Sequence, residues 1–426
     1  MEEFEKISVF GLGYIGLPTA AMFASYKIEV VGVDINKTTV ETINRGDIHI
    51  VEPDLDIAVH AAVTEGLLRA TTTPETAQAF LIAVPTPFLG ENHDPDLSFI
   101  KNAALAIASV LEKGNLVILE STSPVGATEQ MADWLAEARP DLSFPQSHGE
   151  SSDIRIAHCP ERVLPGKVIR ELVSNDRVIG GMTQRCSDMA TRLYKTFVTG
   201  ECVTASNTRV AEMAKLTENS FRDVNLAFAN ELSVICDRQE IDVWELISLA
   251  NRHPRVNILQ PGPGVGGHCI AVDPWFVVSS SPDEAKLIRT AREVNDEKPD
   301  WVLDRIEQAI KNFLDAHPTR NASDVRVACY GLTFKADIDD LRESPSLRIV
   351  EKLVAQNRYQ ILVTEPHLLE PPQHLQGIRF VSHEDALSGA DIHVMLVAHS
   401  AFAVGQPASG TVLNFAAAWP PNGTSA

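Results

Sequence analysis

The motif Gly11-Leu12-Gly13-Tyr14-Ile15-Gly16 constrains the fold of this chain more than any other feature of the sequence. A short apolar run at 7–10 precedes it, and 17–26 follows with the pattern of a helix. A second apolar run, 29–33, ends at Asp34. Glycine tolerates the tight turn from a strand into a helix and lets another group approach the backbone closely. The segment therefore predicts a strand, a helix and a second, parallel strand.

The same segment predicts a dinucleotide site, because the N-terminus of the helix can receive a pyrophosphate. The contacting residues would be Gly11, Gly13, Tyr14, Ile15 and Gly16. Asp34 would accept a hydrogen bond from a ribose 2′-OH and repel a 2′-phosphate, which favours NAD over NADP. Lys37 could soften that repulsion. A turn with a purely structural role is the alternative.

Strand and helix patterns continue to alternate along the rest of the chain. Apolar runs at 80–84, 116–120 and 154–158 indicate one parallel sheet, and those at 325–331, 360–364 and 390–397 indicate another. The segment 208–237 has no proline or glycine and predicts one long helix, and 300–316 predicts a second helix. We therefore predict an α/β protein with two doubly wound, Rossmann-like domains joined by a long central helix. The expected bounds are 1–205 for the first Rossmann-like domain, 206–300 for a central helical and dimerisation domain, 301–418 for the second Rossmann-like domain and 419–426 for a flexible tail.

Composition excludes several classes of protein. The formal net charge of −21 argues against general nucleic-acid or membrane-surface binding. No apolar run is long enough to span a bilayer, and the acidic start lacks a signal-peptide pattern. The six cysteines show no CxxC or zinc-type spacing, so we expect reduced thiols and no metal site. These features predict a soluble, cytoplasmic protein.

A glycine-rich loop, 262–268, leads directly into Cys269. If a helix starts near Ile270, Cys269 lies at its positive end, where a thiol ionises more readily. Asp273 would then lie on the same side, one turn later. This arrangement is typical of a nucleophilic thiolate with a polar partner. A tight turn with an inert, buried cysteine is the alternative.

Polar residues at the predicted strand ends are further candidates. Thr86, Thr122 and Thr128 follow two strands of the first sheet, where ligands bind in doubly wound folds. Ordinary turn chemistry explains any one of them about as well. Glu161 and Arg162 leave a third strand, where they could act as an acid or base and as an anion ligand.

The predicted central helix carries Lys215, Asn219 and Arg222 at i, i+4 and i+7, which places them on one face. The alternative is a solvated face, because acidic residues alternate with them and could form surface ion pairs. The interleaved acidic residues are Glu212, Glu218 and Asp223. A long apolar helix between two α/β halves is also a natural dimerisation element.

Cationic residues indicate an anionic ligand. His253 and Arg255, with Arg252, suit phosphate or carboxylate recognition. Lys335 and Arg342 lie close in sequence to Ser344, a plausible N-cap of the next helix. The second Rossmann-like domain lacks a GxGxxG motif, so we expect a nucleoside diphosphate there rather than a second dinucleotide.

Several runs of the sequence together resemble the UDP-glucose/GDP-mannose dehydrogenase family. They are GLGYIGLPTA, VDIN, INRGDIHIVEPDL, AVPTPF, ESTSPVG, CPERVLPG, AEMAKLTENSFRDVN, NRHPRVNILQPGPGVGGHCIAVDPW and FKADIDDLRESPS. They occur in order from residue 7 to about residue 400. The NRHPR and ERVLPG runs resemble the N-acetylmannosamine branch. In members that oxidise UDP-glucose, the run at the place of ERVLPG resembles PEFLxEG. Pro165 therefore stands where those members usually have a second glutamate.

The resemblance implies a four-electron oxidation of a UDP-linked N-acetylmannosamine at C6, with NAD as the cofactor. The alcohol first becomes an aldehyde, which Cys269 attacks. The resulting thiohemiacetal becomes a thioester, which is hydrolysed to the uronate. The resemblance also implies a homodimer and a product used for surface polysaccharides such as enterobacterial common antigen.

The resemblance assigns roles residue by residue. Lys215 would be an acid/base or hold the oxyanion, Asn219 would support it, and Asp273 would order water or Lys215. Glu161 matches a glutamate proposed as a base in relatives. The substrate-contacting positions would be Arg162, Val163, Lys215, Asn219, Arg222, His253, Arg255, Gly266, Phe334 and Lys335. Arg342 would contact NAD, and Arg255 would reach a neighbouring subunit's site.

Two alternatives to this function remain. One is a UDP-glucose 6-dehydrogenase on the same scaffold. The other is a catalytically silent protein that binds NAD and a UDP-sugar as a regulator. Such a regulator is expected to have lost the cysteine or the lysine, and Cys269 and Lys215 are both present.

Overall fold

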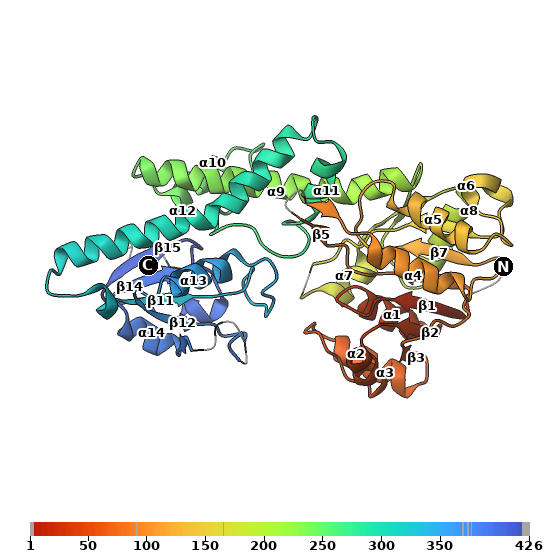
Figure 1. Ribbon diagram of the computed structural model, residues 1–426, viewed down its shortest axis with the longest axis horizontal. Coiled ribbons are helices and arrows are strands. Elements are labelled where there is room, and N and C mark those ends of the chain that lie inside the picture. Colours follow the sequence, from red (N-terminus) through yellow and green to blue (C-terminus); the bar gives the residue numbers. More distant parts are fainter. Residues whose placement is uncertain are drawn as a thin grey trace. The chain divides into compact units, whose positions relative to one another are not determined.

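The computed structural model describes residues 4–90, 93–164, 166–368, 370–372, 375 and 377–419. The chain divides into two compact units, which Figure 1 shows coloured along the sequence. The first unit comprises 1–218 with 279–281, and the second comprises 219–278 with 282–426. The long helix α9 (Thr208–Arg238) begins in the first unit and ends in the second.

The first unit is built on an eight-stranded sheet. Its strands, in spatial order, are β10 (Cys202–Ala205), β9 (Arg177–Gly181), β8 (Arg155–His158), β7 (Leu116–Leu119), β4 (Ala79–Ile82), β1 (Lys6–Phe10), β2 (Glu29–Val33) and β3 (Leu68–Thr71). Neighbouring strands are parallel except for β8 and β9, which are antiparallel. The chain leaves β1 toward β2 on one side, and β4 pairs with β1 on the other. This reversal of strand order beside β1 is where a doubly wound sheet binds its ligand.

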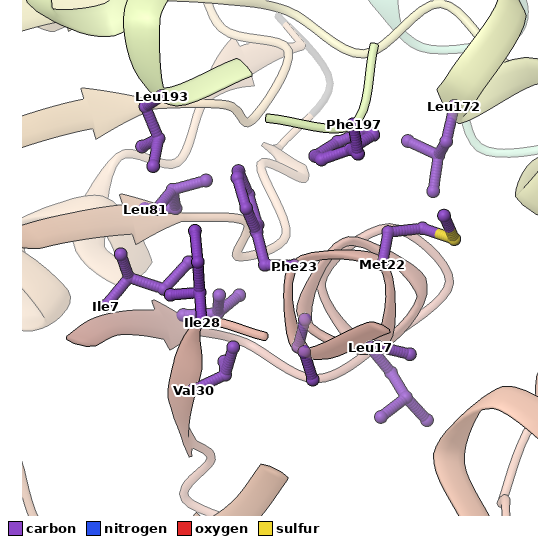
Figure 2. Packing of buried hydrophobic residues seen from close by; sticks show 14 of the residues in the cluster. Ile7, Leu17, Met22, Phe23, Ile28, Val30, Leu81, Leu172, Leu193 and Phe197 are labelled. Carbon is purple, nitrogen blue, oxygen red and sulfur yellow. The ribbon is translucent and has the colours of Figure 1, made fainter. Parts of the chain in front are cut away.

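Helices cover both faces of this sheet. They are α1 (Gly16–Ser25), α2 (Lys37–Asn44), α3 (Leu55–Thr64), α4 (Ser98–Ala108), α5 (Ala127–Ala138), α6 (Pro145–His148), α7 (Val168–Ser174) and α8 (Gln184–Tyr194). One apolar cluster joins α1, α3, α7 and α8 to the sheet, and a second joins α4 and α5 to the opposite face. Phe23 of α1 packs edge-on against Phe197 in the first cluster, with ring centroids 4.7 Å apart (Figure 2). A short hairpin, β5 (Phe88–Leu89) and β6 (Asp94–Pro95), follows β4.

The second unit contains a smaller sheet with five parallel strands. In spatial order they are β13 (Arg379–Phe380), β12 (Gln360–Thr364), β11 (Arg326–Tyr330), β14 (Ile392–Met395) and β15 (Thr411–Asn414). Its helices are α10 (Val243–Ala250), α11 (Asp273–Ser280, of which the last two residues belong to the first unit), α12 (Lys286–Ala316), α13 (Pro345–Ala355) and α14 (His383–Gly389). Apolar side chains of α12 and α13 cover one face and those around α14 the other. The predicted α/β class with two doubly wound sheets is confirmed.

Helix α12 is longer than the predicted helix at 300–316, because it continues through Pro299. Proline normally ends or kinks a helix, since it lacks an N–H and its ring crowds the preceding turn. Here the first half of α12 is held to α9 by buried polar contacts. Arg292 Nη1 lies 2.6 Å from Asp223 Oδ1, and Asn230 Nδ2 donates to Asn295 Oδ1 at 2.8 Å. Tertiary contacts therefore extend this helix to Lys286, on the N-terminal side of residue 300, where the predicted helix began.

The segment after β15 is packed as far as the structure describes it. Trp419, which we expected to begin a flexible tail, is buried against Tyr330 with ring centroids 4.8 Å apart. Its Nε1 donates to the carbonyl of Phe402 at 3.1 Å. Residues 420–426 of the predicted tail lie outside the described residues. Across the described chain, no helix combines the length and the apolar character needed to cross a bilayer.

Candidate active site

The three glycines of the first motif have different structural roles. Gly11 has φ +86°, and a Cβ there would lie 2.6 Å from the carbonyl oxygen of Ala83. A Cβ on Gly16 would overlap the carbonyl oxygen of Gly11. These two positions therefore require glycine for packing. A Cβ on Gly13 would have no atom within 4 Å. The turn is thus open at its middle glycine, beside the N-terminus of α1, where Ile15 provides no side-chain cap.

Asp34 lies beside this turn at the end of β2. Its Oδ2 accepts the backbone N–H of Leu12 at 2.9 Å, and its Oδ1 accepts that of Asn36 at 2.9 Å. His49 lies nearby: burial lowers the pKa of its imidazole, while the Asp34 carboxylate and a hydrogen bond to the Leu12 backbone oppose that change. The open glycine, the uncapped helix start and the fixed carboxylate fit the adenosine and pyrophosphate half of a dinucleotide. Sequence reasoning missed His49.

Two of the three candidate threonines meet at the ends of neighbouring strands. Thr86 Oγ1 donates to the carbonyl oxygen of Thr122 at 2.5 Å, beyond β4 and β7. Thr128 differs, because it is fully buried and its hydroxyl donates to Glu212 Oε1 at 2.6 Å. Glu212 also accepts the N–H groups of Gly126 and Thr128 at the start of α5. Thr128 therefore joins α5 to α9, and its contact with the cofactor stays a prediction.

The segment that follows β8 is held by charged side chains. Glu161 is buried, with Oε2 2.6 Å from Arg177 Nη1. Arg162 Nη2 lies 2.8 Å from Glu218 Oε1 on α9. Val163 is half-buried against the apolar cluster of the first unit, and Pro165 lies outside the described residues. Lys215 is half-buried on α9, one turn before Glu218.

A residue that sequence reasoning missed fixes the far end of this segment. Glu52 is buried, and its two carboxylate oxygens accept the backbone N–H groups of Gly166 and Val168 at 2.8 and 2.7 Å. Val168 is the first residue of α7 and Gly166 lies two residues before it, so Glu52 holds the start of that helix from a different part of the chain. The run INRGDIHIVEPDL contains Glu52, but the residue it contacts is distant in sequence.

The cysteine loop lies in the second unit. Cys269 is partly exposed and is not part of a disulfide. Helix α11 begins at Asp273 rather than near Ile270, so the helix start we assumed is wrong by about one turn. The carbonyl oxygen of Cys269 accepts the N–H groups of Val272 and Asp273 at 3.1 and 2.8 Å. Cys269 therefore lies at the start of the turn that leads into α11.

Polar and close-packed contacts surround this loop within the same unit. Asp273 is buried and its Oδ2 accepts a hydrogen bond from Asn219 Nδ2. The N–H of Gly267 donates to the carbonyl oxygen of Arg342 at 3.0 Å. A Cβ on Gly266 would lie 2.5 Å from the carbonyl oxygen of Glu343 and 2.7 Å from Phe334 Cβ. Glycine at 266 is therefore required for the loop to pack on the segment after β11.

The remaining candidates occupy accessible positions. Arg222 is exposed on α9, and His253 and Arg255 are exposed after α10. Lys335 is half-buried in the segment that follows β11. Arg342 is paired with Asp340, at 2.6 Å between Nη2 and Oδ2. The second unit thus brings together Asn219, Asp273, Cys269, Gly266, Phe334 and Arg342, whereas Lys215, Glu161, Arg162 and Val163 belong to the first.

Among the described residues, Asp337, His367 and His399 are spaced closely enough to bind a metal ion, with ligand atoms within 4.8 Å of one another. Both ring nitrogens of His399 already have hydrogen-bond partners. Its Nδ1 accepts the N–H of Asp337 at 2.9 Å, and its Nε2 lies 3.1 Å from Glu365 Oε2. Hydrogen bonding between the segments that follow β11, β12 and β14 therefore explains the position of this histidine.

Comparison with known proteins shows which family this chain belongs to. Models of the UDP-glucose/GDP-mannose dehydrogenase family match residues 5–198 as its NAD binding domain, 209–297 as its central domain and 328–413 as its UDP binding domain. The chain belongs to the UDP-glucose/GDP-mannose dehydrogenase family. It is an NAD-dependent dehydrogenase.

Individual relatives of the dehydrogenase match almost its whole length. A UDP-N-acetyl-D-mannosamine dehydrogenase of Campylobacter jejuni is 64% identical over 94% of this chain and 97% of its own. An NDP-N-acetyl-D-galactosaminuronic acid dehydrogenase of Ralstonia nicotianae is also 64% identical, over 94% and 92%. The solved UDP-D-ManNAc dehydrogenase of Pyrococcus horikoshii superposes with a TM-score of 0.85 at 36% identity, covering 98% of this chain and 97% of that one.

Proposed function

We propose that the dehydrogenase oxidises UDP-N-acetyl-D-mannosamine at C6 to UDP-N-acetyl-D-mannosaminuronate, removing four electrons. The observation that carries this proposal is the setting of Cys269. The thiol is partly exposed on a glycine-rich loop that packs on the segment 334–343, and Asp273 follows it with its carboxylate bound to Asn219. A nucleophilic cysteine lets one site convert an alcohol to an acid without releasing the aldehyde.

Bound NAD⁺ supplies the hydride acceptor for both oxidation steps. The glycine turn and Asp34 would hold its pyrophosphate and adenosine ribose, and the strand ends at Thr86 and Thr122 would face its other half. Arg342 of the second unit would add a contact. In the first step Lys215 takes the proton of the C6 hydroxyl or stabilises the developing oxyanion, supported by Asn219.

In the second step the Cys269 thiolate attacks the aldehyde carbon, and the carbonyl oxygen becomes the oxyanion of a thiohemiacetal. Lys215 is the cation that would stabilise it. Loss of the C6 hydride leaves a thioester, and water then releases the carboxylate and returns the thiol. Asp273 would orient that water. Overall, one alcohol, one water and two oxidised cofactors give one carboxylate, two reduced cofactors and three protons.

Substrate recognition would use residues from several segments of the chain. They are Arg162, Val163, Lys215, Asn219, Arg222, His253, Arg255, Gly266, Phe334 and Lys335. The cationic members suit the diphosphate, and Arg255 would act in a neighbouring subunit's site. Glu161 is a candidate base by resemblance. We place the reaction in the cytoplasm and its product in surface-polysaccharide synthesis, such as that of enterobacterial common antigen.

A substrate panel tests the proposal. NADH formation is measured with UDP-N-acetylmannosamine, UDP-N-acetylgalactosamine, UDP-N-acetylglucosamine and UDP-glucose, and the sugar product is identified by mass spectrometry. We expect two NADH per UDP-N-acetylmannosamine and the highest kcat/KM for that sugar. The name of the Ralstonia relative makes an N-acetylgalactosamine nucleotide the second candidate substrate, which UDP-N-acetylgalactosamine represents in the panel. A preference for UDP-glucose would overturn the proposed branch, and cofactor binding without turnover would support a regulator.

We also propose that the enzyme is a homodimer that uses α9. Phe221, Phe228 and Ile235 recur at intervals of two helical turns and are 69%, 51% and 42% exposed. An apolar stripe of this kind on a long helix favours burial against another protein surface. Analytical ultracentrifugation of wild type and Phe228→Glu tests the proposal, with Lys311→Glu, at an exposed position on α12, as the control. We expect Phe228→Glu alone to produce monomers.

A further inference from the structure

A buried group of charged side chains lies beneath the segment that follows β8. The side chain of Arg177 is 2% exposed, and those of Glu161 and Glu120 are 6% and 0% exposed. Arg177 Nη1 lies 2.6 Å from Glu161 Oε2 and 3.6 Å from Glu120 Oε1. The guanidinium also lies over the ring of Tyr194, 4.9 Å from its centroid. One cation thus lies between two buried carboxyl groups.

The antiparallel pairing of β8 and β9 explains why Arg177 faces Glu161. His158 pairs with Gly180 and Ala157 with Gly181. Continuing this register beyond the end of β8 brings residue 161 opposite residue 177. If β9 were parallel to β8, Arg177 would lie at the other end of the strands, near the start of β8. The single antiparallel pair in this sheet therefore supplies the cation.

Glu120 and Glu161 lie in different electrostatic environments. The pKa of Glu120 is raised to about 7: burial raises it most, Arg177 opposes that change, the charge of Glu161 adds to it, and a hydrogen bond from Tyr194 opposes it. The charged and titratable neighbours of Glu120 are Arg177, Glu161, Tyr194 and Cys159. Two ionised carboxylates against one buried cation would leave an uncompensated charge. A neutral Glu120 leaves Arg177 with one ionic partner, Glu161.

Both oxygens of Glu161 are occupied. Oε2 accepts from Arg177, and Oε1 accepts the backbone N–H of Arg162 at 2.7 Å. The carbonyl oxygen of Arg162 in turn accepts from Asn175 Nδ2 at 2.9 Å. A buried guanidinium and a backbone amide therefore hold the carboxylate in one position through charge-assisted hydrogen bonds. Glu161 is thus placed to fix the backbone at Arg162.

We propose that Arg177 is a positioning residue that acts through Glu161 and holds Arg162 and Val163 in place for the UDP-sugar. This inference rests on the proposed function, in which those two residues contact the substrate. It changes the role of Glu161 from a catalytic base to a fixed anion. Asn175 and Glu52 hold the same segment at other points.

Steady-state kinetics of four variants tests the role of Arg177. Arg177→Met removes the cation, Arg177→Lys keeps the charge, and Glu161→Gln keeps an acceptor for the Arg162 amide. Arg155→Met is the matched control, because Arg155 is another buried arginine of this sheet that bonds Ser152 rather than a carboxylate. We expect Arg177→Met to raise the KM for the UDP-sugar about ten- to a hundredfold, with the KM for NAD⁺ little changed. Arg177→Lys should lie in between, and Arg155→Met should affect thermal stability alone.

The Glu161→Gln variant separates positioning from base catalysis. A positioning role predicts that kcat stays within about tenfold of wild type while KM rises. Loss of a general base predicts a fall in kcat of about 10²–10⁴-fold at unchanged KM, and that result would overturn the proposal. The same conclusion follows if Arg177→Met behaves like Arg155→Met. If Arg177→Met does not fold, Arg177→Lys and Glu161→Gln decide the question.

Hydrogen exchange provides a readout that does not depend on turnover. We expect faster exchange of the amides of 162–164 in the Arg177 variants than in wild type or Arg155→Met. If the wild type oxidised none of the UDP-sugars, the proposed function would fail while this measurement still tested the positioning. Unchanged exchange together with wild-type activity would reject the positioning alone.

Discussion

Asn219 of α9 donates a hydrogen bond through Nδ2 to Asp273 Oδ2, at the first residue of α11. Both residues are buried, and they lie 54 positions apart in the sequence. The N–H of Asp273 in turn donates to the carbonyl oxygen of Cys269. Asn219 therefore helps to fix the turn that carries the proposed nucleophile.

Asn219→Ala is expected to lower the free energy of unfolding by about 1.5–3 kcal/mol, because a buried carboxylate loses a donor. Chemical denaturation measures the change. Asn225→Ala on the same helix is the control, since its amide bonds only the carbonyl of Phe221. Equal losses in the two variants would contradict a special role for the pair of Asn219 and Asp273.

Cys269→Ala is expected to abolish formation of the uronate while NAD⁺ binding stays close to that of wild type, because the thioester can no longer form. The measurements are product analysis and calorimetric titration with NAD⁺. Cys202→Ala is the control, since Cys202 is also partly exposed but lies on β10. Two NADH per sugar from the Cys269 variant would rule out covalent catalysis.

Asp34 is expected to set the choice of cofactor. Wild-type enzyme should have a much higher kcat/KM for NAD⁺ than for NADP⁺, because the carboxylate repels a 2′-phosphate. Asp34→Ala should lose about ten- to a hundredfold in kcat/KM for NAD⁺. Equal kcat/KM for the two cofactors in wild type would indicate that Lys37 or another cation dominates.

Lys298 is expected to make stability depend on pH. Burial lowers the pKa of its ammonium from 10.5 to about 7, while Asp237 opposes the change. Between these two values the unfolded chain binds a proton that the folded chain does not, so stability rises with pH across that window. The slope from this group approaches about 1.4 kcal/mol per pH unit.

Denaturation of wild type and Lys298→Met between pH 6.5 and 9.5 measures this slope. The difference between the two proteins should change with pH, whereas the exposed Lys311→Met on the same helix should behave like wild type. A parallel pH dependence of wild type and Lys298→Met would contradict the prediction.

Local sequence signals were sufficient for the parts of the fold that depend on neighbouring residues. The glycine motif predicted the turn between β1 and α1, and the alternation of apolar runs predicted two doubly wound sheets. The absence of proline and glycine predicted α9. The same reasoning began one helix at residue 300 and another near Ile270, because it could not include the contacts that extend α12 toward its N-terminus or delay α11.

The sequence by itself determined which residue types are available at the candidate site: a thiol after a run of glycines, an acid at the end of β2 and cations near helix starts. Only the tertiary structure decided which of them share a hydrogen bond. Glu52 reaches Gly166 across 114 positions, and Arg177 faces Glu161 because one strand is antiparallel. Thr128 is enclosed by Glu212 for the same kind of reason. Burial and pairing depend on how distant segments pack, and no local pattern encodes that packing.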